Sequence, residues 1–251
     1  GFDTTLNISL VERIFQGKGG IHDMKNKLAA FGKVFVCFLV FELLAVFVPE
    51  LWALFLQNTS LDEETMVQLY QAGSSLLVIL VAFPGFILAM RLFGTLPHFF
   101  WKEKRKATSG ELVKYILLSI LPVFVLYGAA FIVSRISHTS LRDMLGSLTW
   151  MDVVREGILG CLLMPAMEEV MFRGLMLHRL ESEGQVFAMT VTTIFFAVGH
   201  NNPINMILGL ATGWLFAYMV LKHGGIRYAL FCHIAVNILG NLVIPGIYCL
   251  R

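Results

Sequence analysis

Two adjacent glutamates, Glu168 and Glu169, lie in a stretch of the chain that is otherwise apolar, and Arg173 follows them. An ionisable side chain inside a membrane helix costs about 3 kcal/mol on insertion scales, so each of the three is a candidate for function. Residues four apart share one face of a helix, and Glu169 and Arg173 are therefore predicted to form an ion pair. Glu168 points about 100° away from Glu169, and we predict that it faces the interior of a helix bundle.

Two later apolar segments each carry a histidine. His233 and Asn237 are four residues apart on one predicted helix, so both could donate a hydrogen bond to the same oxygen atom. Phe196 and His200 share a helical face in the same way. Because three helices each bring polar groups, a shared site is favoured over separate hydrogen bonds between helices.

These residue types together could hydrolyse a peptide bond. A carboxylate in a dry pocket, with an imidazole beside it, can take a proton from water and deliver the hydroxide to a carbonyl carbon. Glu168 is the predicted base, and His200 is predicted to position the same water. His233 and Asn237 could then stabilise the oxyanion of the tetrahedral intermediate.

The same residues leave other interpretations open. The charged groups near Glu168 could only lock helices together, as in a non-catalytic membrane scaffold or a bacteriocin-immunity protein. Glu168, His200 and His233 could bind zinc, although the sequence lacks the H-E-x-x-H motif. A proton-coupled transporter would also use intramembrane Glu and His, but repeated halves are missing. Cys232 could be a thiol nucleophile, yet it points about 100° away from its neighbour His233.

Composition places these residues in a membrane protein. Of the 251 residues, 57% are hydrophobic and only 14% are charged, and the mean hydropathy is +0.75. The polar surface is then too small for an ordinary water-soluble domain. No run of like charges suggests a nucleic-acid partner, so the expected partners are the lipid bilayer and a peptide or protein precursor. The four cysteines are too widely spaced for a zinc ribbon, and the sequence suggests neither a metal nor another cofactor.

The elements that must position the site are long apolar helices. Since a helix needs roughly 20 apolar residues to cross the hydrocarbon core, the sequence predicts an all-α polytopic membrane bundle with about seven transmembrane helices. Their expected ranges are 34–56, 72–93, 112–134, 153–177, 185–203, 204–222 and 226–246. The segment from Leu6 to Phe15 has the apolar spacing of an interfacial helix.

The chain then divides into three predicted regions. Residues 1–33 form a cytoplasmic segment, residues 34–150 supply three transmembrane helices of unassigned role, and residues 151–251 supply a catalytic core of four. Most Lys and Arg residues fall on one side of these spans when the N-terminus is placed in the cytoplasm, which predicts that orientation. The expected location is the plasma membrane of a bacterium.

In order and spacing, the three motifs resemble those of the CPBP family, the CAAX proteases and bacteriocin-processing enzymes, also called the Abi family. They are Glu168-Glu169-x-x-x-Arg173, Phe196-x-x-x-His200 and His233-x-x-x-Asn237. The stretch from Glu168 to Leu175, EEVMFRGL, is similar to that family's extended first motif. The resemblance covers about residues 155–240.

The resemblance implies a metal-free intramembrane glutamic endopeptidase. It implies that Glu168 and His200 activate water and that His233 and Asn237 form an oxyanion hole, with Glu169, Arg173 and Phe196 in supporting positions. The short chain is similar to bacterial members, whose substrates would be peptide precursors rather than prenylated proteins. The family often has a tryptophan shortly before its third motif, where this chain has Arg227-Tyr228, so the substrate entrance is expected to differ.

Overall fold

The computed structural model describes residues 21–96, 104–146, 148–200 and 202–249, and 86% of these residues are helical. No strand occurs in these ranges, which confirms the all-α membrane bundle. The interfacial helix predicted between Leu6 and Phe15 lies outside the described residues.

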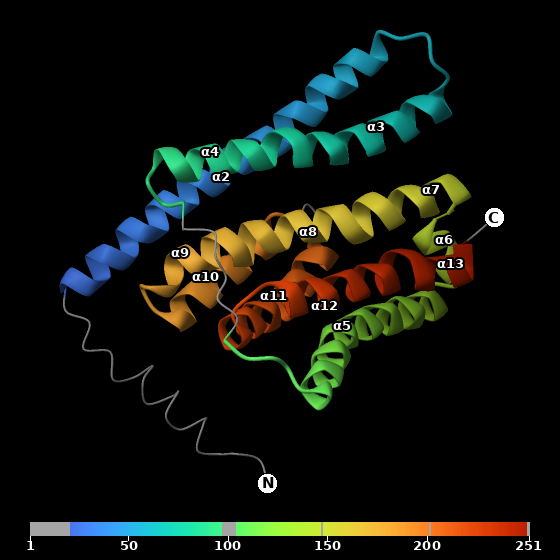
Figure 1. The fold of residues 1–251 in the computed structure, drawn as a ribbon. Coiled ribbons are helices and arrows are strands. Elements are labelled where there is room, and N and C mark those ends of the chain that lie inside the picture. The colour runs from blue at the N-terminus through green and yellow to red at the C-terminus, as the bar shows by residue number, and fades with distance from the viewer. Residues whose placement is uncertain (1–20, 97–103, 147, 201, 250–251) are drawn as a thin grey trace.

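The helices form a hairpin, a long central helix and a group of later helices (Figure 1). The bounds in chain order are α2 (Ile21–Gln57), α3 (Glu63–Leu77), η1 (Val78–Ala82), α4 (Phe83–Leu92), α5 (Ser109–Ile136), α6 (Leu141–Leu145), α7 (Trp150–Arg155), η2 (Glu156–Leu163), α8 (Met164–Glu168), η3 (Glu169–Leu177), α9 (His178–Glu181), α10 (Gln185–Val198), α11 (Pro203–His223), α12 (Arg227–Asn237), η4 (Ile238–Val243) and α13 (Ile244–Cys249). Segments labelled η are π-helical. The runs 63–92, 150–181 and 227–249 are each continuous.

Proline explains three of the four π-helical segments. The segments η1, η2 and η4 each end two residues before a proline, namely Pro84, Pro165 and Pro245. Proline has no N–H and its ring clashes with the carbonyl four residues earlier, so the preceding turn widens and bonds to the fifth residue instead. The sequence therefore sets where the helices that carry the candidate site change their pitch.

Five described helices are long and apolar enough to cross a membrane: Asp23–Gln57, Glu63–Leu92, Ser109–Ile136, Pro203–His223 and Arg227–Cys249. The predicted number of seven is not confirmed. The span expected over 185–203 is a helix of 14 residues that ends at Val198, about 21 Å long against a hydrocarbon core of about 30 Å. The span expected over 153–177 lies on the continuous helix 150–181, which is long enough but contains several charged residues.

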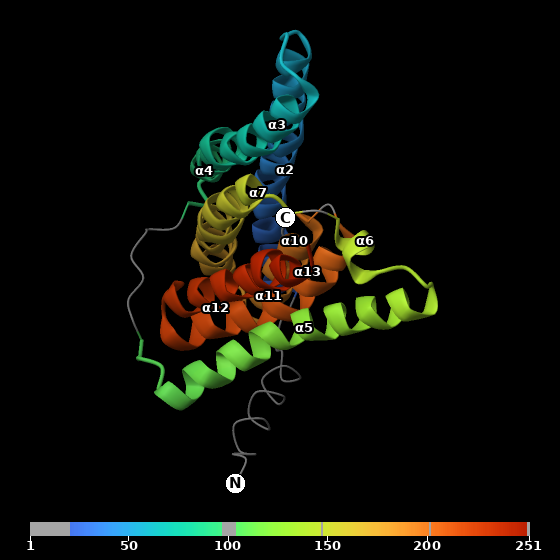
Figure 2. The same ribbon diagram turned by 90° about the vertical axis from the view of Figure 1, so that its right-hand side faces the viewer.

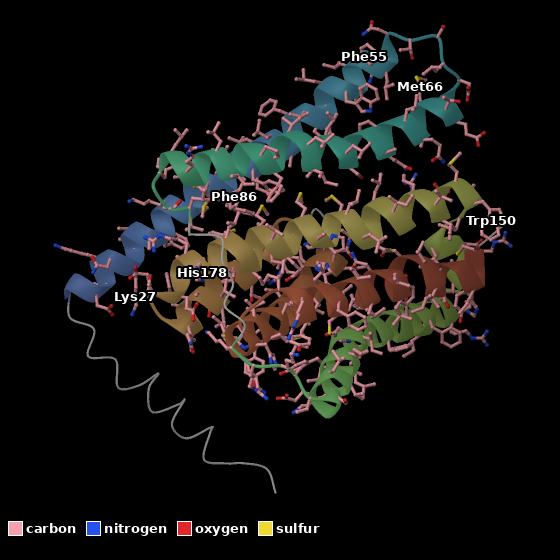
Figure 3. All side chains as sticks on the ribbon, in the orientation of Figure 1. Lys27, Phe55, Met66, Phe86, Trp150 and His178 are labelled. Carbon is pink, nitrogen blue, oxygen red and sulfur yellow. The ribbon has the colours of Figure 1, made fainter. Side chains whose placement is uncertain are left out.

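The helices pack in layers around the helix 150–181. Figures 1 and 2 show this helix between the hairpin of α2 with α3 to α4 and the group of α11, α12 and α5. The hairpin packs on the rest through buried aromatic rings, as where Phe38 on α2 stacks on Phe195 of α10 at a centroid distance of 4.8 Å. Figure 3 shows Phe86 on the inner side of α4, whereas Phe55 and Met66 lie at the end of the hairpin that projects beyond the other helices.

The outer surface of the bundle is apolar. Leu80 on η1 is 67% exposed, and Leu43, Val125 and Ile247 are exposed in the same way on other helices. Water would penalise such a surface, but lipid chains match it. Together with the five long apolar helices, this surface shows a multi-pass membrane protein.

Candidate active site

The polar centre of the bundle is the ion pair between Glu169 and Arg173. Arg173 Nη1 donates to Glu169 Oε1 at 3.0 Å, and both side chains are 0% exposed. Arg173 Nη2 donates to the carbonyl oxygen of Gly213 on α11 at 3.2 Å. The pair predicted from a spacing of four residues is therefore confirmed, and it also fastens the helix 150–181 to α11.

Aromatic rings surround the guanidinium of Arg173. Its Cζ lies 4.2 Å from the ring centroid of Phe196, 5.4 Å from that of Phe216 and 5.9 Å from that of Phe172. Ring faces attract a cation, and more strongly where water is excluded. Phe196 also meets His233 edge-on at 5.5 Å, so this ring separates the buried arginine from the histidine.

His233 is held by both glutamates. Its Nδ1 donates to Glu169 Oε1 at 2.9 Å, the oxygen that also accepts from Arg173. Its Nε2 lies 3.5 Å from Glu168 Oε2. Since an ionised carboxylate can only accept, Nδ1 carries a proton, and Nε2 becomes a donor only when the ring is charged. The Glu169 carboxylate thus fixes the orientation of the ring.

His200 also carries its proton on Nδ1, but its partner is a backbone carbonyl. Its Nδ1 lies 2.7 Å from the carbonyl oxygen of Phe196, which can only accept, so the proton is on Nδ1. The neutral ring then leaves Nε2 as an acceptor. The ring of Phe196 packs edge-on against the same imidazole at 5.0 Å, which restricts its rotation.

Asn237 is anchored by a carbonyl group that a proline leaves free. Its Nδ2 donates to the carbonyl oxygen of Gly160 at 2.9 Å. Met164 N–H bonds to Leu159 in the π-helical turn, and the next residue, Pro165, has no N–H to offer to Gly160. The amide of Asn237 uses one N–H in this contact and keeps the second for a ligand.

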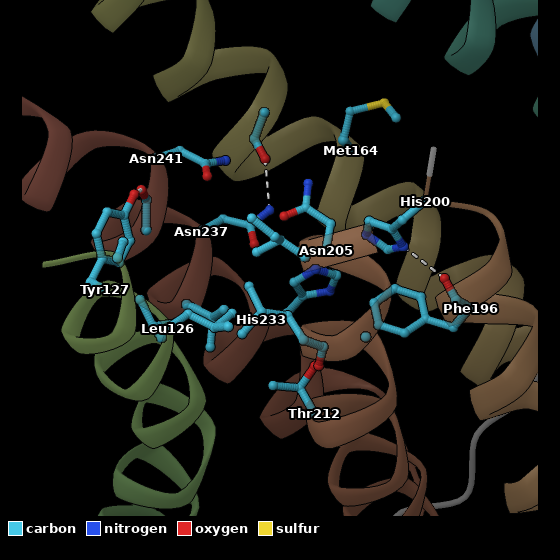
Figure 4. A pocket seen from close by; sticks show the side chains of 18 of the residues that line it. Leu126, Tyr127, Met164, Phe196, His200, Asn205, Thr212, His233, Asn237 and Asn241 are labelled. Carbon is cyan, nitrogen blue, oxygen red and sulfur yellow. Dashed lines mark hydrogen bonds between the residues drawn. The ribbon is translucent and has the colours of Figure 1, made fainter. Parts of the chain in front are cut away.

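These groups meet at a cavity of about 570 Å³ inside the bundle (Figure 4). Glu168, His200, His233 and Asn237 all line it, whereas Glu169 and Arg173 do not. Glu168 is 17% exposed and faces the cavity, while its neighbour Glu169 is completely buried. The structure thus brings the four candidate catalytic residues to one cavity and places the ion pair behind them.

The cavity also has polar lining residues that the sequence analysis missed. Asn205 on α11 and Asn241 on η4 line it, as does Tyr127 on α5, whose Oη donates to the carbonyl oxygen of Gly240 at 2.6 Å. The spacing of four residues from Asn237 to Asn241 repeats the spacing from His233 to Asn237, so a longer reading of the third motif could have found Asn241. No comparable signal pointed to Asn205.

This geometry offers no set of ligands for the zinc ion considered above. Within the described ranges, no three or more side chains of His, Cys, Asp or Glu are grouped so that they could hold a metal ion. Glu168 approaches His233 only at 3.5 Å, and Nδ1 of His233 is already bound to Glu169.

The close approach of α11 to the ion pair requires a glycine. A Cβ at Gly213 would lie 3.1 Å from both Phe196 Cδ1 and Thr193 Cγ2 and 3.2 Å from Arg173 Nη2. We expect Gly213→Ala to lower the free energy of unfolding by about 1–3 kcal/mol, as overpacking usually does. The control is Gly128→Ala on α5, where nothing lies within 4 Å. Denaturant titration in detergent micelles checks both variants, and equal stabilities would contradict the expectation.

One comparison with known proteins finds a match, and it falls on this region. Residues 150–239 match the family model described as Type II CAAX prenyl endopeptidase Rce1-like. Comparisons with curated proteins and with solved structures find no match. The matched residues contain all three sequence motifs and every side chain of the polar centre. The segment that builds the candidate active site therefore matches the Rce1-like type II CAAX prenyl endopeptidases, within the CPBP family of intramembrane proteases.

Proposed function

We propose that the protein is an intramembrane glutamic endopeptidase that hydrolyses a peptide bond in a membrane-associated peptide or protein precursor. The observation that carries the proposal is the cavity, where side chains from the helix 150–181, the end of α10 and α12 meet inside an apolar bundle. The membership of this segment in a protease family supports the same reaction class.

In the first step, Glu168 removes a proton from a water molecule in the cavity. His200 orients this water, because its unprotonated Nε2 can accept a hydrogen bond from the water while Nδ1 is held by Phe196. The hydroxide attacks the carbonyl carbon of the substrate, and the electron pair of the C=O bond moves onto its oxygen. A tetrahedral oxyanion results, and the proton is held on the Glu168 carboxyl group.

The oxyanion then needs hydrogen-bond donors. Asn237 supplies the N–H that Gly160 does not occupy, and His233 supplies Nε2–H when both of its ring nitrogens carry a proton. When the C–N bond breaks, the protonated Glu168 gives its proton to the leaving nitrogen. The products are one carboxylic acid and one amine, so a single water molecule accounts for all the atoms.

The test compares membrane and secreted peptides, by mass spectrometry, from cells with equal amounts of wild-type protein or the Glu168→Gln variant. Fragments found only with wild type support the proposal and identify the precursor. Identical peptide profiles from two folded, inserted proteins would overturn it and favour a non-catalytic scaffold or immunity protein. Cleavage that is lost to chelators and restored by zinc would overturn the metal-free mechanism alone.

The role of Pro165 leads to a separate expectation. With Pro165→Ala the helix regains an N–H at this position, and the carbonyl of Gly160 can bond within the helix instead of to Asn237. We expect kcat to fall about tenfold, the effect of a misplaced oxyanion donor, without any loss of stability. Pro84→Ala is the matched control. Pro84 also follows a π-helical segment, but it lies in α4, far from Pro165 in the sequence. An unchanged kcat would contradict the expectation.

A further inference from the structure

The cavity carries two carboxamide side chains, Asn205 and Asn241, to which the proposed reaction gives no role. Asn205 extends from α11 and Asn241 from η4, and Figure 4 shows Asn205 near Asn237 and the histidines and Asn241 on the other side of Asn237. Both side chains are exposed toward the cavity. Within the described ranges neither side chain has a hydrogen-bond partner, unlike Asn237, which is anchored on Gly160.

The unpartnered carboxamides in this cavity are free to bind a ligand. Each Asn side chain offers two N–H donors and one carbonyl acceptor, and no lipid chain can bond to them. A peptide backbone offers the complementary set, one donor and one acceptor for each residue. The chemistry of the two residues therefore matches a peptide main chain and does not depend on a particular side chain of the substrate.

The spacing along the helix also fits an extended peptide. Asn237 and Asn241 are four residues apart where the helix becomes π-helical at Ile238, so they lie close to one turn apart, about 5 Å along the axis. Two residues of an extended strand cover about 6.6 Å and return the backbone groups to the same side. When the carbonyl of the scissile bond lies at Asn237, Asn241 therefore meets a backbone group two residues away.

One wall of the cavity is largely apolar. On α5, Val123, Leu126, Ala130 and Val133 share one face of the helix and line the cavity. An extended chain whose backbone bonds to the asparagines would turn alternate side chains toward this face. The wall thus suits small or medium apolar side chains.

We propose that Asn205 and Asn241 are positioning residues that bind the main chain of an extended, apolar substrate segment on either side of the scissile bond. This inference rests on the proposed endopeptidase function. It adds a substrate class, a segment recognised by its backbone and by apolar side chains, and it needs no attached group on the substrate.

The test uses a synthetic peptide that spans the cleavage site found in the mass-spectrometry comparison, together with a series in which one amide at a time is replaced by an ester. An ester removes a single N–H and weakens the adjacent acceptor. For the all-amide peptide, Asn241→Ala is expected to lower kcat/KM about tenfold, mainly through KM, as the loss of one hydrogen bond in a dry pocket. The matched control is Asn58→Ala, because Asn58 lies outside the cavity and donates to the carbonyl oxygen of Leu54.

The decisive readout is the coupling between variant and ester. For wild type, kcat/KM is expected to fall about tenfold when the ester stands two residues from the scissile carbonyl. For Asn241→Ala, the same ester is expected to lower kcat/KM no further. If the loss caused by the variant and the loss caused by the ester multiply at every ester position, the inference is overturned, but the endopeptidase function stands. Asn205→Ala, coupled to a different ester, gives the same test if Asn241→Ala does not fold. A wild-type protein that cleaves no peptide overturns the proposed function itself.

Discussion

Glu168→Gln is expected to lower the rate of peptide cleavage about a thousandfold while the protein stays as stable as wild type. A glutamine has nearly the shape of glutamate but cannot take a proton from water, so the loss measures general-base catalysis. The side chain lies in the cavity, and its ion-pair contact is with His233, at 3.5 Å, whereas the hydrogen bonds of the buried ion pair are made by Glu169. Single-turnover cleavage of the identified precursor measures the rate, and denaturant titration of both proteins measures their stability.

The neighbouring glutamate provides the matched control. Glu169 is absent from the cavity and is bound to Arg173 and His233 inside the bundle. Glu169→Gln should therefore destabilise the protein, whereas Glu168→Gln should not. A large loss of stability in Glu168→Gln, or full activity in that variant, would contradict the assignment of Glu168 as the base.

The local part of the site could be predicted from sequence because its geometry is helical. Residues four apart share a face in any helix, so the pair of Glu169 and Arg173 followed from spacing alone. The contact of His233 with Glu169 joins residues 64 positions apart, and no spacing rule predicts such a contact. The same limit applies to Asn205, which enters the cavity only because of how α11 packs.

The predicted number of transmembrane helices shows a second limit of prediction from sequence. Hydropathy registers apolar residues but does not distinguish a helix that faces lipid from a helix buried in protein. Most side chains of α10 are buried among other helices, so its 14 residues are apolar for packing and need not reach across the bilayer. The helix 150–181 shows the reverse case, because it is long but carries the charges that the site requires.

The second large effect concerns the buried ion pair itself. Glu169→Gln is expected to lower the free energy of unfolding by about 3–5 kcal/mol, because it leaves the buried Arg173 without a countercharge. Arg173→Met should cost less, since Glu169 keeps its hydrogen bond from His233 and the histidine can supply a positive charge. Denaturant titration of the wild type, the two single variants and the double variant in mixed micelles measures these differences.

The double variant separates the net contribution of the pair from the cost of breaking it. In the described part of the chain, Glu169 Oε2 and Arg173 Nε have no hydrogen-bond partner, so the pair is incompletely satisfied. Its net stabilisation is then small, and the double variant should lose clearly less stability than the sum of the two single losses. Activity should nevertheless be lost in every variant that lacks Glu169, because His233 no longer has the carboxylate that orients Nδ1. Additive losses of stability, or an active Glu169→Gln protein, would show that the ion pair does not hold the histidine in place.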